Sequence, residues 1–471
     1  MQKNSIKNQI IKNLGFDLTN SQEVTSGLLS DFFVSKNSSC CFLLKGYAGT
    51  GKTTLISACV KSLISARIKV VLLAPTGRAA KVLSSYSGYP AYTIHKWIYR
   101  KQSQKDGFGK FVLNRNTLKN AVFIVDEASM ISNNSTDDST FGSGRLLDDL
   151  IQFISSGEEC KLMLVGDIAQ LPPVKLAISP ALDKSVLQTF GFDVIEITLG
   201  EVVRQAKDSG ILFNATKIRE MLELDKIQIP KFQVEGFNDI EKITGSDFLE
   251  SLESSYSRAG TVDTVVINYS NKRANKYNQG IRNRILWREE ELSPGDFLMV
   301  VKNNYFWVEN VPEVSFIANG DIVEVIRILK VKELYGFRFA DVSVRLIDYQ
   351  QQELNVTILL DTLDIDGPSL PVEKSKELFN SISEDYAYIQ NRKTRISKIN
   401  DDVHFNALQV KFAYAVTCHK AQGGQWREVY IDQGFFREDM INREYIRWLY
   451  TALTRATEKV YLINFNPVFF D

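Results

Sequence analysis

The sequence has few cysteines and histidines, which excludes several kinds of site and scaffold. Among 471 residues there are five cysteines and three histidines. The cysteines stand singly or adjacent to one another, mostly inside apolar runs, and never in the C-x-x-C spacing of a metal or redox site. We therefore expect no zinc site and five reduced core thiols, at Cys40, Cys41, Cys59, Cys160 and Cys418.

The sequence also lacks an excess of charge of either sign and any long apolar run. Lys+Arg and Asp+Glu number 56 each, so a basic surface for nucleic acid has to be local. No window approaches the roughly 20 apolar residues that a membrane span needs. An apolar content of 44% is typical of a globular chain, and the length predicts roughly three compact units. We expect a soluble, cytoplasmic protein without membrane contact.

Short apolar runs recur between amphipathic stretches. Strands that are buried on both faces have this pattern. Between the first two runs, residues 54–65 carry apolar side chains at helical spacing. Such alternation predicts an α/β fold with parallel sheets. The runs lie at residues 40–44, 70–73, 121–125, 161–165, 193–197, 264–267, 428–431 and 459–463.

Three stretches interrupt this alternation. Residues 96–118 are basic and aromatic around a DGFG centre, which indicates a hairpin. Residues from about 290 to 405 carry alternating segments and turn signals, which predict a small all-β insertion. Residues 133–144 are small and polar and indicate a loop, either a partner-binding element or a neutral insertion.

The stretch GYAGTGKT, Gly46 to Thr53, matches the phosphate-binding pattern G-x-x-x-x-G-K-[ST]. It follows an apolar run and precedes a predicted helix, so loop amides and the helix N-terminus would face phosphates. Lys52 would reach the β and γ oxygens, and the Thr53 hydroxyl would bind Mg²⁺.

A second motif, VFIVDEAS, places Asp126 and Glu127 after four apolar residues. An adjacent acidic pair is more often solvated surface. At the carboxyl edge of a parallel sheet, however, one carboxylate can assist the metal while the other polarises the attacking water. Together with the phosphate loop, the pair indicates an NTPase.

Hydrolysis of a γ-phosphoryl group also needs positive charge on the developing oxygens. Arg204 in LGEVVRQ and Arg455 in YTALTRA are candidates for this role. Taken alone, either side chain would be an ordinary surface arginine.

Further blocks complete an ordered set of eight that spans nearly the whole chain. They are GYAGTGKTT (46–54), LLAPTGRAAKVL (72–83), TIH (93–95), VDEASM (125–130), VGDIAQLPPV (165–174), LGEVVRQ (199–205), AYAVTCHKAQGGQW (413–426) and YTALTRA (450–456). This set resembles the motifs of superfamily 1 helicases of the RecD-like and Dda-like group, close to the PIF-type helicases.

The resemblance implies an α/β fold with two RecA-like P-loop domains, each a parallel sheet with helices on both faces. The first core would cover residues 1–198 and carry a β-hairpin pin at about 96–118. The second core would comprise 199–289 and 405–471. An SH3-type β-barrel would be inserted at 290–404.

The resemblance also implies ATP as substrate and Mg²⁺ as cofactor in the cleft between the cores. Gln22 would read adenine, Asp126 would assist the metal with Thr53, and Glu127 would be the general base. Arg204 and Arg455 would be the fingers that sense the γ-phosphate. The other expected ATP contacts are Gly46, Ala48, Gly49, Thr50, Gly51, Lys52, Thr54, Gln170 and Gly423.

Single-stranded DNA would run across both cores. Small hydroxyls and strand-end amides contact phosphates and sugars without reading bases. His95 could equally be a core histidine, and Trp97 and the hairpin phenylalanines could be core and hairpin packing rather than base-stacking groups. The implied DNA contacts are Pro75, Thr76, Arg78, Thr93, His95, Phe108, Thr417, His419 and Lys420.

The chain departs from the family pattern at Gly424 and Gln425, where many relatives have a small hydroxyl and an acid. The resemblance implies an ATP-dependent helicase that unwinds duplex DNA 5′ to 3′. It would act as a monomer on single-stranded, forked or tailed DNA, with repair or recombination proteins as candidate partners. Two alternatives stay open: a DNA-stimulated ATPase or binding subunit of a larger complex, and an RNA helicase of the same superfamily.

The resemblance also implies that the block VGDIAQLPPV couples hydrolysis to movement. Asp167 ends a strand at the same sheet edge as Asp126, so Gln170 would lie near the γ-phosphate. Pro172 and Pro173 fix the backbone that follows and stiffen the loop.

Overall fold

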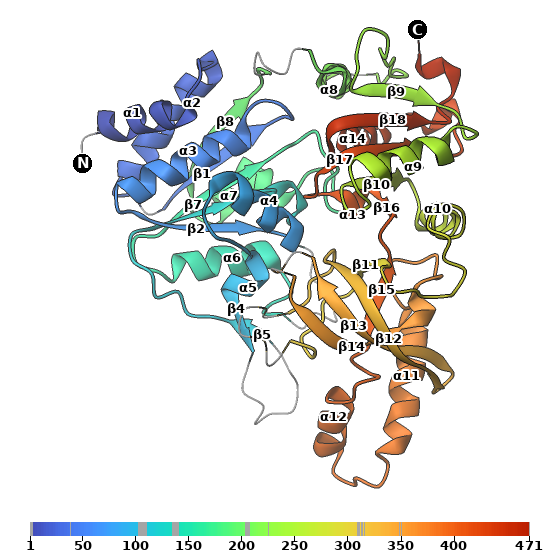
Figure 1. Cartoon of the computed structure of the whole chain (residues 1–471). Coiled ribbons are helices and arrows are strands. Elements are labelled where there is room, and N and C mark those ends of the chain that lie inside the picture. The colour runs from blue at the N-terminus through green and yellow to red at the C-terminus, as the bar shows by residue number, and fades with distance from the viewer. Residues whose placement is uncertain are drawn as a thin grey trace.

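The computed structural model describes residues 3–37, 39–101, 111–133, 141–202, 208–224, 226–308, 311, 314, 316–347, 349 and 351–470. Figure 1 shows two α/β cores side by side, with a barrel below them and a pair of helices beyond the barrel. In the part of the chain so described, no helix is both long and apolar enough to cross a membrane.

The first core is a six-stranded parallel sheet in the order β3-β2-β6-β7-β1-β8. Successive strand residues pack on opposite faces: Phe42 lies against α1 to α4, whereas Leu43 lies against α5 to α7. The strands are β1 (Cys40–Gly46), β2 (Lys69–Ala74), β3 (Ala91–Thr93), β6 (Ala121–Val125), β7 (Lys161–Gly166) and β8 (Asp193–Leu199). The helices are α1 (Lys3–Leu14), α2 (Asn20–Val34), α3 (Lys52–Ser65), α4 (Gly77–Ser87), α5 (Ile94–Ile98), α6 (Leu146–Ser155) and α7 (Lys184–Thr189).

The second core is a five-stranded parallel sheet in the order β16-β10-β17-β18-β9. Helices α8 and α14 cover one face, and α9 and α10 cover the other. The strands are β9 (Ile240–Ile243), β10 (Thr264–Asn268), β16 (Ala415–Thr417), β17 (Trp426–Asp432) and β18 (Ala456–Ile463). The helices are α8 (Gly210–Met221), α9 (Phe248–Arg258), α10 (Asn271–Arg284), α13 (Cys418–Ala421) and α14 (Arg443–Leu453).

The insertion in the second core is a closed five-stranded barrel. Its strands are β11 (Phe297–Val300), β12 (Ile322–Leu334), β13 (Phe337–Leu346), β14 (Glu353–Leu359) and β15 (Leu408–Phe412). Because β15 closes the barrel, we propose that the insertion ends near residue 412 rather than at 404. The two RecA-like cores and the barrel confirm the predicted fold class.

The prediction that the insertion is all β is wrong. Two helices, α11 (Val372–Asp385) and α12 (Arg392–Asn400), lie between β14 and β15. Leu378 and Ile382 of α11 are four residues apart, which places both on the helix face that is buried against the barrel. We call α11 and α12 the helical arm.

The hairpin in the first core is formed by β4 (Tyr99–Lys101) and β5 (Phe111–Leu113), paired antiparallel. Its predicted tip, with Phe108, lies outside the described residues. The hairpin base contacts the barrel, because the Phe111 and Tyr305 ring centroids are 4.2 Å apart. Phe141, at the end of the polar stretch 133–144, stacks on Phe111 at 4.9 Å. Residues 134–140 of that stretch lie outside the described residues.

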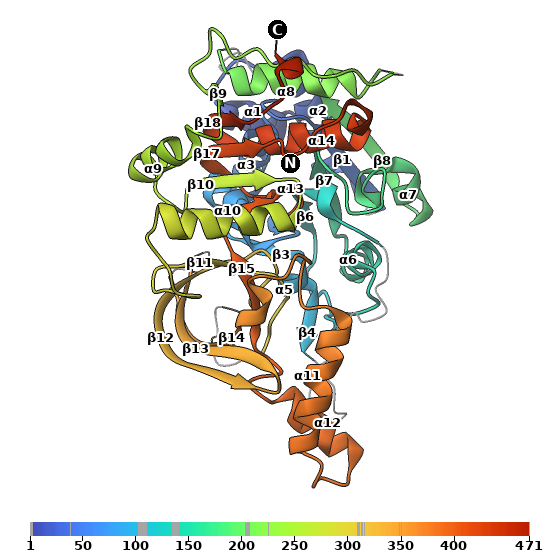
Figure 2. The ribbon, with the colours of Figure 1, turned by 90° about the vertical axis from the view of Figure 1, so that its right-hand side faces the viewer.

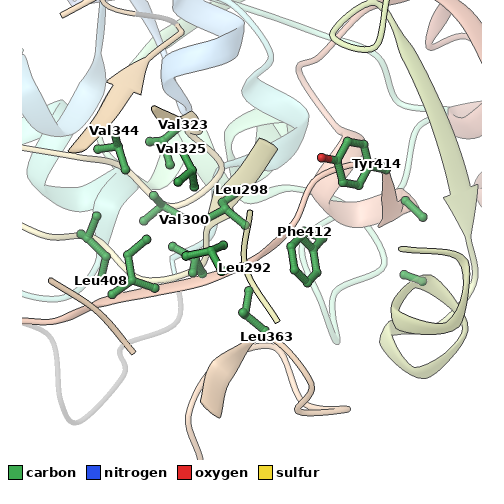
Figure 3. Close-up of a cluster of buried hydrophobic side chains, with 14 of the residues drawn as sticks. Leu292, Leu298, Val300, Val323, Val325, Val344, Leu363, Leu408, Phe412 and Tyr414 are labelled. Carbon is green, nitrogen blue, oxygen red and sulfur yellow. The ribbon is translucent and has the colours of Figure 1, made fainter. Parts of the chain in front are cut away.

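The barrel interior and one face of the second sheet share a single buried cluster (Figure 3). Val300 and Leu408 of the barrel belong to the same cluster as Val266 and Tyr430 of the sheet. The barrel is therefore joined rigidly to the second core. All five cysteines are free and buried, as predicted.

A buried ion pair lies at the junction between α10 and the barrel. Asp296 accepts two hydrogen bonds of 3.0 Å from Arg282 and one of 2.8 Å from Arg288. It also accepts a hydrogen bond of 2.9 Å from the Tyr414 hydroxyl. The carboxylate and the Arg282 guanidinium are almost inaccessible to solvent.

We expect Asp296→Asn to lower the free energy of unfolding by about 3 to 5 kcal/mol, because it leaves the buried Arg282 without its counter-charge. Urea unfolding followed by tryptophan fluorescence measures the change. The control is Glu377→Gln, which breaks an exposed pair with Lys374 and should cost less than about 1 kcal/mol. Equal effects of the two substitutions would show that the buried pair does not hold the junction.

Candidate ATP and DNA sites between the two cores

The phosphate-binding loop connects β1 to α3 as predicted. Gly49 and Gly51 have φ values of 72° and 81°, a left-handed conformation that favours glycine. A Cβ on Gly46 would lie 2.8 Å from Cγ of Lys52, so the lysine stem needs a glycine beneath it. The Lys52 side chain thus runs from the start of α3 back over the loop, and of the next two residues Thr53 is half-buried and Thr54 exposed.

The Lys52 ammonium is held by the loop itself and by an acid that directly follows β7, the strand beside β1. It donates to the Tyr47 carbonyl oxygen at 2.8 Å and lies 3.7 Å from Oδ2 of Asp167. The Thr50 hydroxyl donates to the same carbonyl at 2.7 Å. A phosphate would have to replace the Tyr47 carbonyl as the partner of the ammonium.

The acidic pair lies directly after β6. The Asp126 amide donates to the Leu73 carbonyl at 2.9 Å, and Oδ1 of Asp126 accepts from the Glu127 amide at 2.9 Å. Burial and then the charge of Glu127 raise the pKa of Asp126 to about 7, although Lys52 lowers it. Glu127 has a φ of 52°, an uncommon value for a residue with a side chain. The half-buried Asp126 carboxylate and the Thr53 hydroxyl are oxygen donors of the kind that fits Mg²⁺.

The loop after β7 is fixed by Asp167, which is buried. Oδ1 of Asp167 accepts from the Ala169 amide at 2.9 Å. Gln170 is 5% exposed, and its Oε1 has no hydrogen-bond partner within the described ranges. A buried oxygen without a partner costs about 1 to 3 kcal/mol, which favours a ligand that supplies a donor. An attacking water could supply it, or the amide could turn and donate to a phosphate oxygen.

The next residue of this loop is bonded to the second core through its backbone. The Leu171 amide donates to Oγ1 of Thr451 at 2.9 Å. The Leu171 carbonyl accepts from Nε2 of Gln422 at 2.6 Å. Both backbone groups of Leu171 are thus used across the interface between the cores.

A tyrosine of the second core contacts the phosphate-binding loop directly. The Tyr450 hydroxyl accepts from the Ala48 amide at 2.7 Å and donates to Oδ2 of Asp167 at 2.7 Å. Its side chain is 1% exposed, and burial together with Asp167 raises its pKa, so the hydroxyl keeps its proton. Tyr450 therefore joins α14 to both the loop and β7.

The two predicted arginine fingers have different outcomes. Arg204 lies outside the described residues. Arg455 is buried and donates to the carbonyls of Thr451 and Gly424 and to the Thr454 hydroxyl, at 3.1, 3.2 and 3.3 Å. These contacts lie within the second core, so Arg455 would have to exchange them for phosphate oxygens.

Gln22 is buried at the start of α2 and contacts the phosphate-binding loop. Its Oε1 accepts from the Thr19 amide at 3.1 Å, and its Nε2 donates to the Thr50 carbonyl at 3.1 Å. A role in adenine recognition stays a prediction.

A second contact between the cores involves α4. A Cβ on Gly423 would lie 2.9 Å from the Cβ of Ala79 and 3.1 Å from Oγ1 of Thr76, so the cores approach closely there. The Arg78 guanidinium lies 3.7 Å from the centre of the Trp426 ring and donates to the Gln425 carbonyl at 3.1 Å. Arg78 is therefore held between the cores, and its predicted DNA contact stays a prediction.

The DNA candidates of the first core lie at helix starts. Thr76 follows Pro75 and accepts from the Ala79 amide at 3.2 Å, and Thr93 accepts from the Lys96 amide at 3.1 Å. A cavity of about 640 Å³ opens between α4, the start of α5 and the barrel. Its described lining combines lysines and aromatic rings without a carboxylate, which is the chemistry of a single-strand groove. That lining includes Lys81, Tyr92, Thr93, Lys96, Phe316 and Tyr349.

His95 packs among aromatic rings rather than in the cavity lining. Its ring centroid is 4.9 Å from that of Phe141 and 6.5 Å from that of Phe316. Burial lowers the pKa of His95 to about 4, so the ring is neutral near pH 7. Trp97 packs against Tyr92, with ring centroids 5.0 Å apart. Base contacts by either ring stay predictions.

The DNA candidates of the second core lie where β16 ends. Thr417 is half-buried and His419 is exposed. The Lys420 ammonium is buried, and no partner is found for it in the described parts of the chain. Burial and the nearby Lys411 lower the pKa of Lys420 to about 8. An anionic ligand such as a DNA phosphate would compensate this buried charge.

Sequence reasoning missed the groups that join the cores: Tyr450, Thr451, the Leu171 backbone and Trp426. Tyr450 and Thr451 belong to the motif YTALTRA, but they lie in a helix whose residues are mostly buried. From the sequence alone they look like core residues.

Comparisons with known proteins agree with the family resemblance of the motifs. Residues 33–221 match a model described as an AAA domain, and residues 412–463 match a model described as a UvrD-like helicase C-terminal domain. The ATP-dependent RecD2 DNA helicase of Deinococcus radiodurans is 25% identical over 89% of this chain and 46% of its own length. The ATP-dependent DNA helicase dda of Enterobacteria phage T4 is 27% identical over 60% of this chain and 62% of its own. This chain thus matches less than two thirds of either relative.

Among solved structures, the Pif1 helicase from Bacteroides in complex with ADP-AlF3 and ssDNA is similar at 15% identity. The similarity covers 96% of this chain and 93% of that one, with a TM-score of 0.48. The first family model covers the phosphate-binding loop and most of the first core, and the second covers the C-terminal part of the second core. RecD2 and dda align with 89% and 60% of this chain. By these matches the chain is similar to the superfamily 1 helicases of the RecD-like and Dda-like group.

Proposed function

We propose that the protein is an ATP-driven helicase that moves along single-stranded DNA and unwinds duplex 5′ to 3′. The observation that carries the proposal is the set of hydrogen bonds between the ATP-site loops of the first core and helix α14 of the second. The binding or loss of a γ-phosphate can therefore change the position of one core relative to the other. The polarity follows from the resemblance to RecD-like enzymes.

In this proposal, ATP binding exchanges existing hydrogen bonds for phosphate contacts. Lys52 would leave the Tyr47 carbonyl for the β and γ oxygens, and Arg455 would leave its three acceptors as the cleft closes. Mg²⁺, held by Thr53 and Asp126, would neutralise charge on the phosphate oxygens. Glu127 would take the proton of the attacking water, which Gln170 would orient.

The DNA would lie across the same interface. Thr93 lies in the first core and the buried Lys420 ammonium in the second, so opening and closing the cleft would change their separation. Contacts from hydroxyls, lysines and aromatic rings bind a strand without reading its sequence. The hairpin of β4 and β5 would meet the duplex ahead of this track.

Unwinding assays on tailed duplexes test the proposal. We expect unwinding of a duplex with a 5′ tail and none of one with only a 3′ tail. ATP turnover should rise on adding single-stranded DNA more than on adding RNA of the same sequence. Lys52→Ala is the control, because it removes the phosphate contact and should abolish turnover. Unwinding only from a 3′ tail would overturn the polarity, and turnover indifferent to DNA would favour a binding subunit.

Gln170→Ala tests the role of the unpartnered Oε1. We expect the variant to bind ATP normally and to lose unwinding by about tenfold or more, with a smaller loss of DNA affinity. Nucleotide binding, DNA binding and unwinding are measured side by side. Equal losses of nucleotide binding, DNA binding and unwinding would show that the loop has only a structural role.

Tyr450→Phe tests the contact between the second core and the phosphate-binding loop. Removing the hydroxyl frees the Ala48 amide and Asp167 from α14, while the ring keeps its packing. Because coupling free energies are about 1 to 3 kcal/mol, we expect about a tenfold fall in base pairs unwound per ATP, with KM for ATP changed much less.

The matched control is Tyr445→Phe on the same helix. Tyr445 is also buried, but its hydroxyl accepts from Gln433, within the second core. This variant should unwind as many base pairs per ATP as the unaltered protein. If both variants behave alike, the Tyr450 hydroxyl has no special part in coupling.

A further inference from the structure

The helical arm extends from the barrel at the end of the molecule where the hairpin also lies. Figures 1 and 2 both show α11 and α12 beyond the barrel strands and β4 in the same lower half of the molecule, and Figure 1 shows β5 beside β4. A duplex that reaches the hairpin would therefore approach from the side of the arm.

The arm is fixed to the barrel by its own small core. Tyr335, in the turn between β12 and β13, donates its hydroxyl proton to Asp385 at the end of α11. Tyr386 donates to Asp402 at 3.1 Å. The first contact ties α11 to the barrel, the second ties the end of α11 to the segment after α12, and Ile399 anchors α12 in the small core. The buried members of the core are Phe337, Phe339, Leu359, Leu370, Leu378, Ile382, Ile399 and Ala407.

Helix α12 carries positive charge only. Its nine residues, RKTRISKIN, include four basic side chains and no acid, and Ile399 is its only buried residue. Arg392, Arg395 and Lys398 follow one another at intervals of three, so they form a ridge with steps of about 4.5 Å along the axis. We call these three residues the α12 ridge.

The α12 ridge has no counter-charge of its own. Within the described residues, no carboxylate lies within ion-pair distance of its three side chains, whereas Lys374 of α11 is paired with Glu377 at 2.6 Å. Like charges at this spacing repel one another, so the ridge destabilises the free helix slightly. The whole chain has equal numbers of acidic and basic residues, so this ridge is a local concentration of positive charge. Its regular spacing suits a ligand with regularly spaced negative charges.

We propose that the α12 ridge binds the phosphate backbone of the duplex ahead of the fork. This inference rests on the proposed function, because it needs DNA as the substrate. The ridge lies on one exposed helix, so we expect it to contact backbone phosphates. Such contacts do not depend on the base sequence. A duplex is the occupant, since the arm lies beyond the barrel, at the hairpin end of the molecule, and away from the cavity assigned to the single strand.

The test compares two variants with the same change in charge. Arg392→Gln with Lys398→Gln removes two of the three charges of the ridge, and Lys374→Gln with Lys376→Gln removes two charges from α11. Binding to a blunt duplex and to single-stranded DNA is measured by fluorescence anisotropy over a series of salt concentrations, together with DNA-stimulated ATP turnover.

We expect the ridge variant to bind duplex about tenfold more weakly and to lose about two units of salt slope, one for each phosphate contact. Its affinity for single-stranded DNA and its stimulated turnover should match those of the α11 variant and of the unaltered protein. Unchanged duplex affinity would overturn the inference. An equal loss for single-stranded DNA would also overturn it, by assigning the ridge to the separated strand.

Failure of the proposed function gives a different result. In that case the unaltered protein shows no stimulation of ATP turnover by DNA. If the stimulation is present and the ridge variant binds duplex normally, only the assignment of the arm is wrong.

Discussion

The hydrogen bonds that hold the backbone of Leu171 to the second core are the interaction on which the proposed activity depends. Leu171 follows Gln170 directly, so the residue that we propose to lie beside the γ-phosphate is one peptide away from a partner in the other core. The Tyr450 hydroxyl makes a second connection, to Ala48 and Asp167. A loop bonded in this way cannot respond to nucleotide without affecting α14, since the paired backbone groups are buried and costly to separate.

The rest of the fold connects these hydrogen bonds to the barrel and the hairpin. The barrel shares a buried cluster with the second sheet, and the pair of Arg282 and Asp296 locks their junction. Movement of α14 is therefore expected to carry the barrel and its helical arm along. The hairpin belongs to the first core but packs on the barrel through Phe111 and Tyr305, so relative movement of the cores acts on the place where strands would be separated.

Much of the fold followed from sequence, because eight apolar runs became strands of the two sheets. The short strands β3, β9 and β16 have three or four residues each, too few for a periodic signal. The helical arm was not predicted, because it lies between β14 and β15 in a region where alternating apolar and polar residues indicate strands. In the site, motifs located the phosphate-binding loop, the acids and Gln170. They did not show that Tyr450 meets Ala48, since 402 positions separate these residues and only folding brings them together.

Amide hydrogen exchange at Leu171 tests the coupling most directly. Pro172 and Pro173 have no amide, so a peptide that spans this loop reports on few positions besides Leu171. If the loop is held by the second core, this amide is protected both without nucleotide and with a non-hydrolysable ATP analogue, and Thr451→Val removes the protection. Exchange in the unaltered protein as fast as in an exposed loop would contradict the coupling through Leu171.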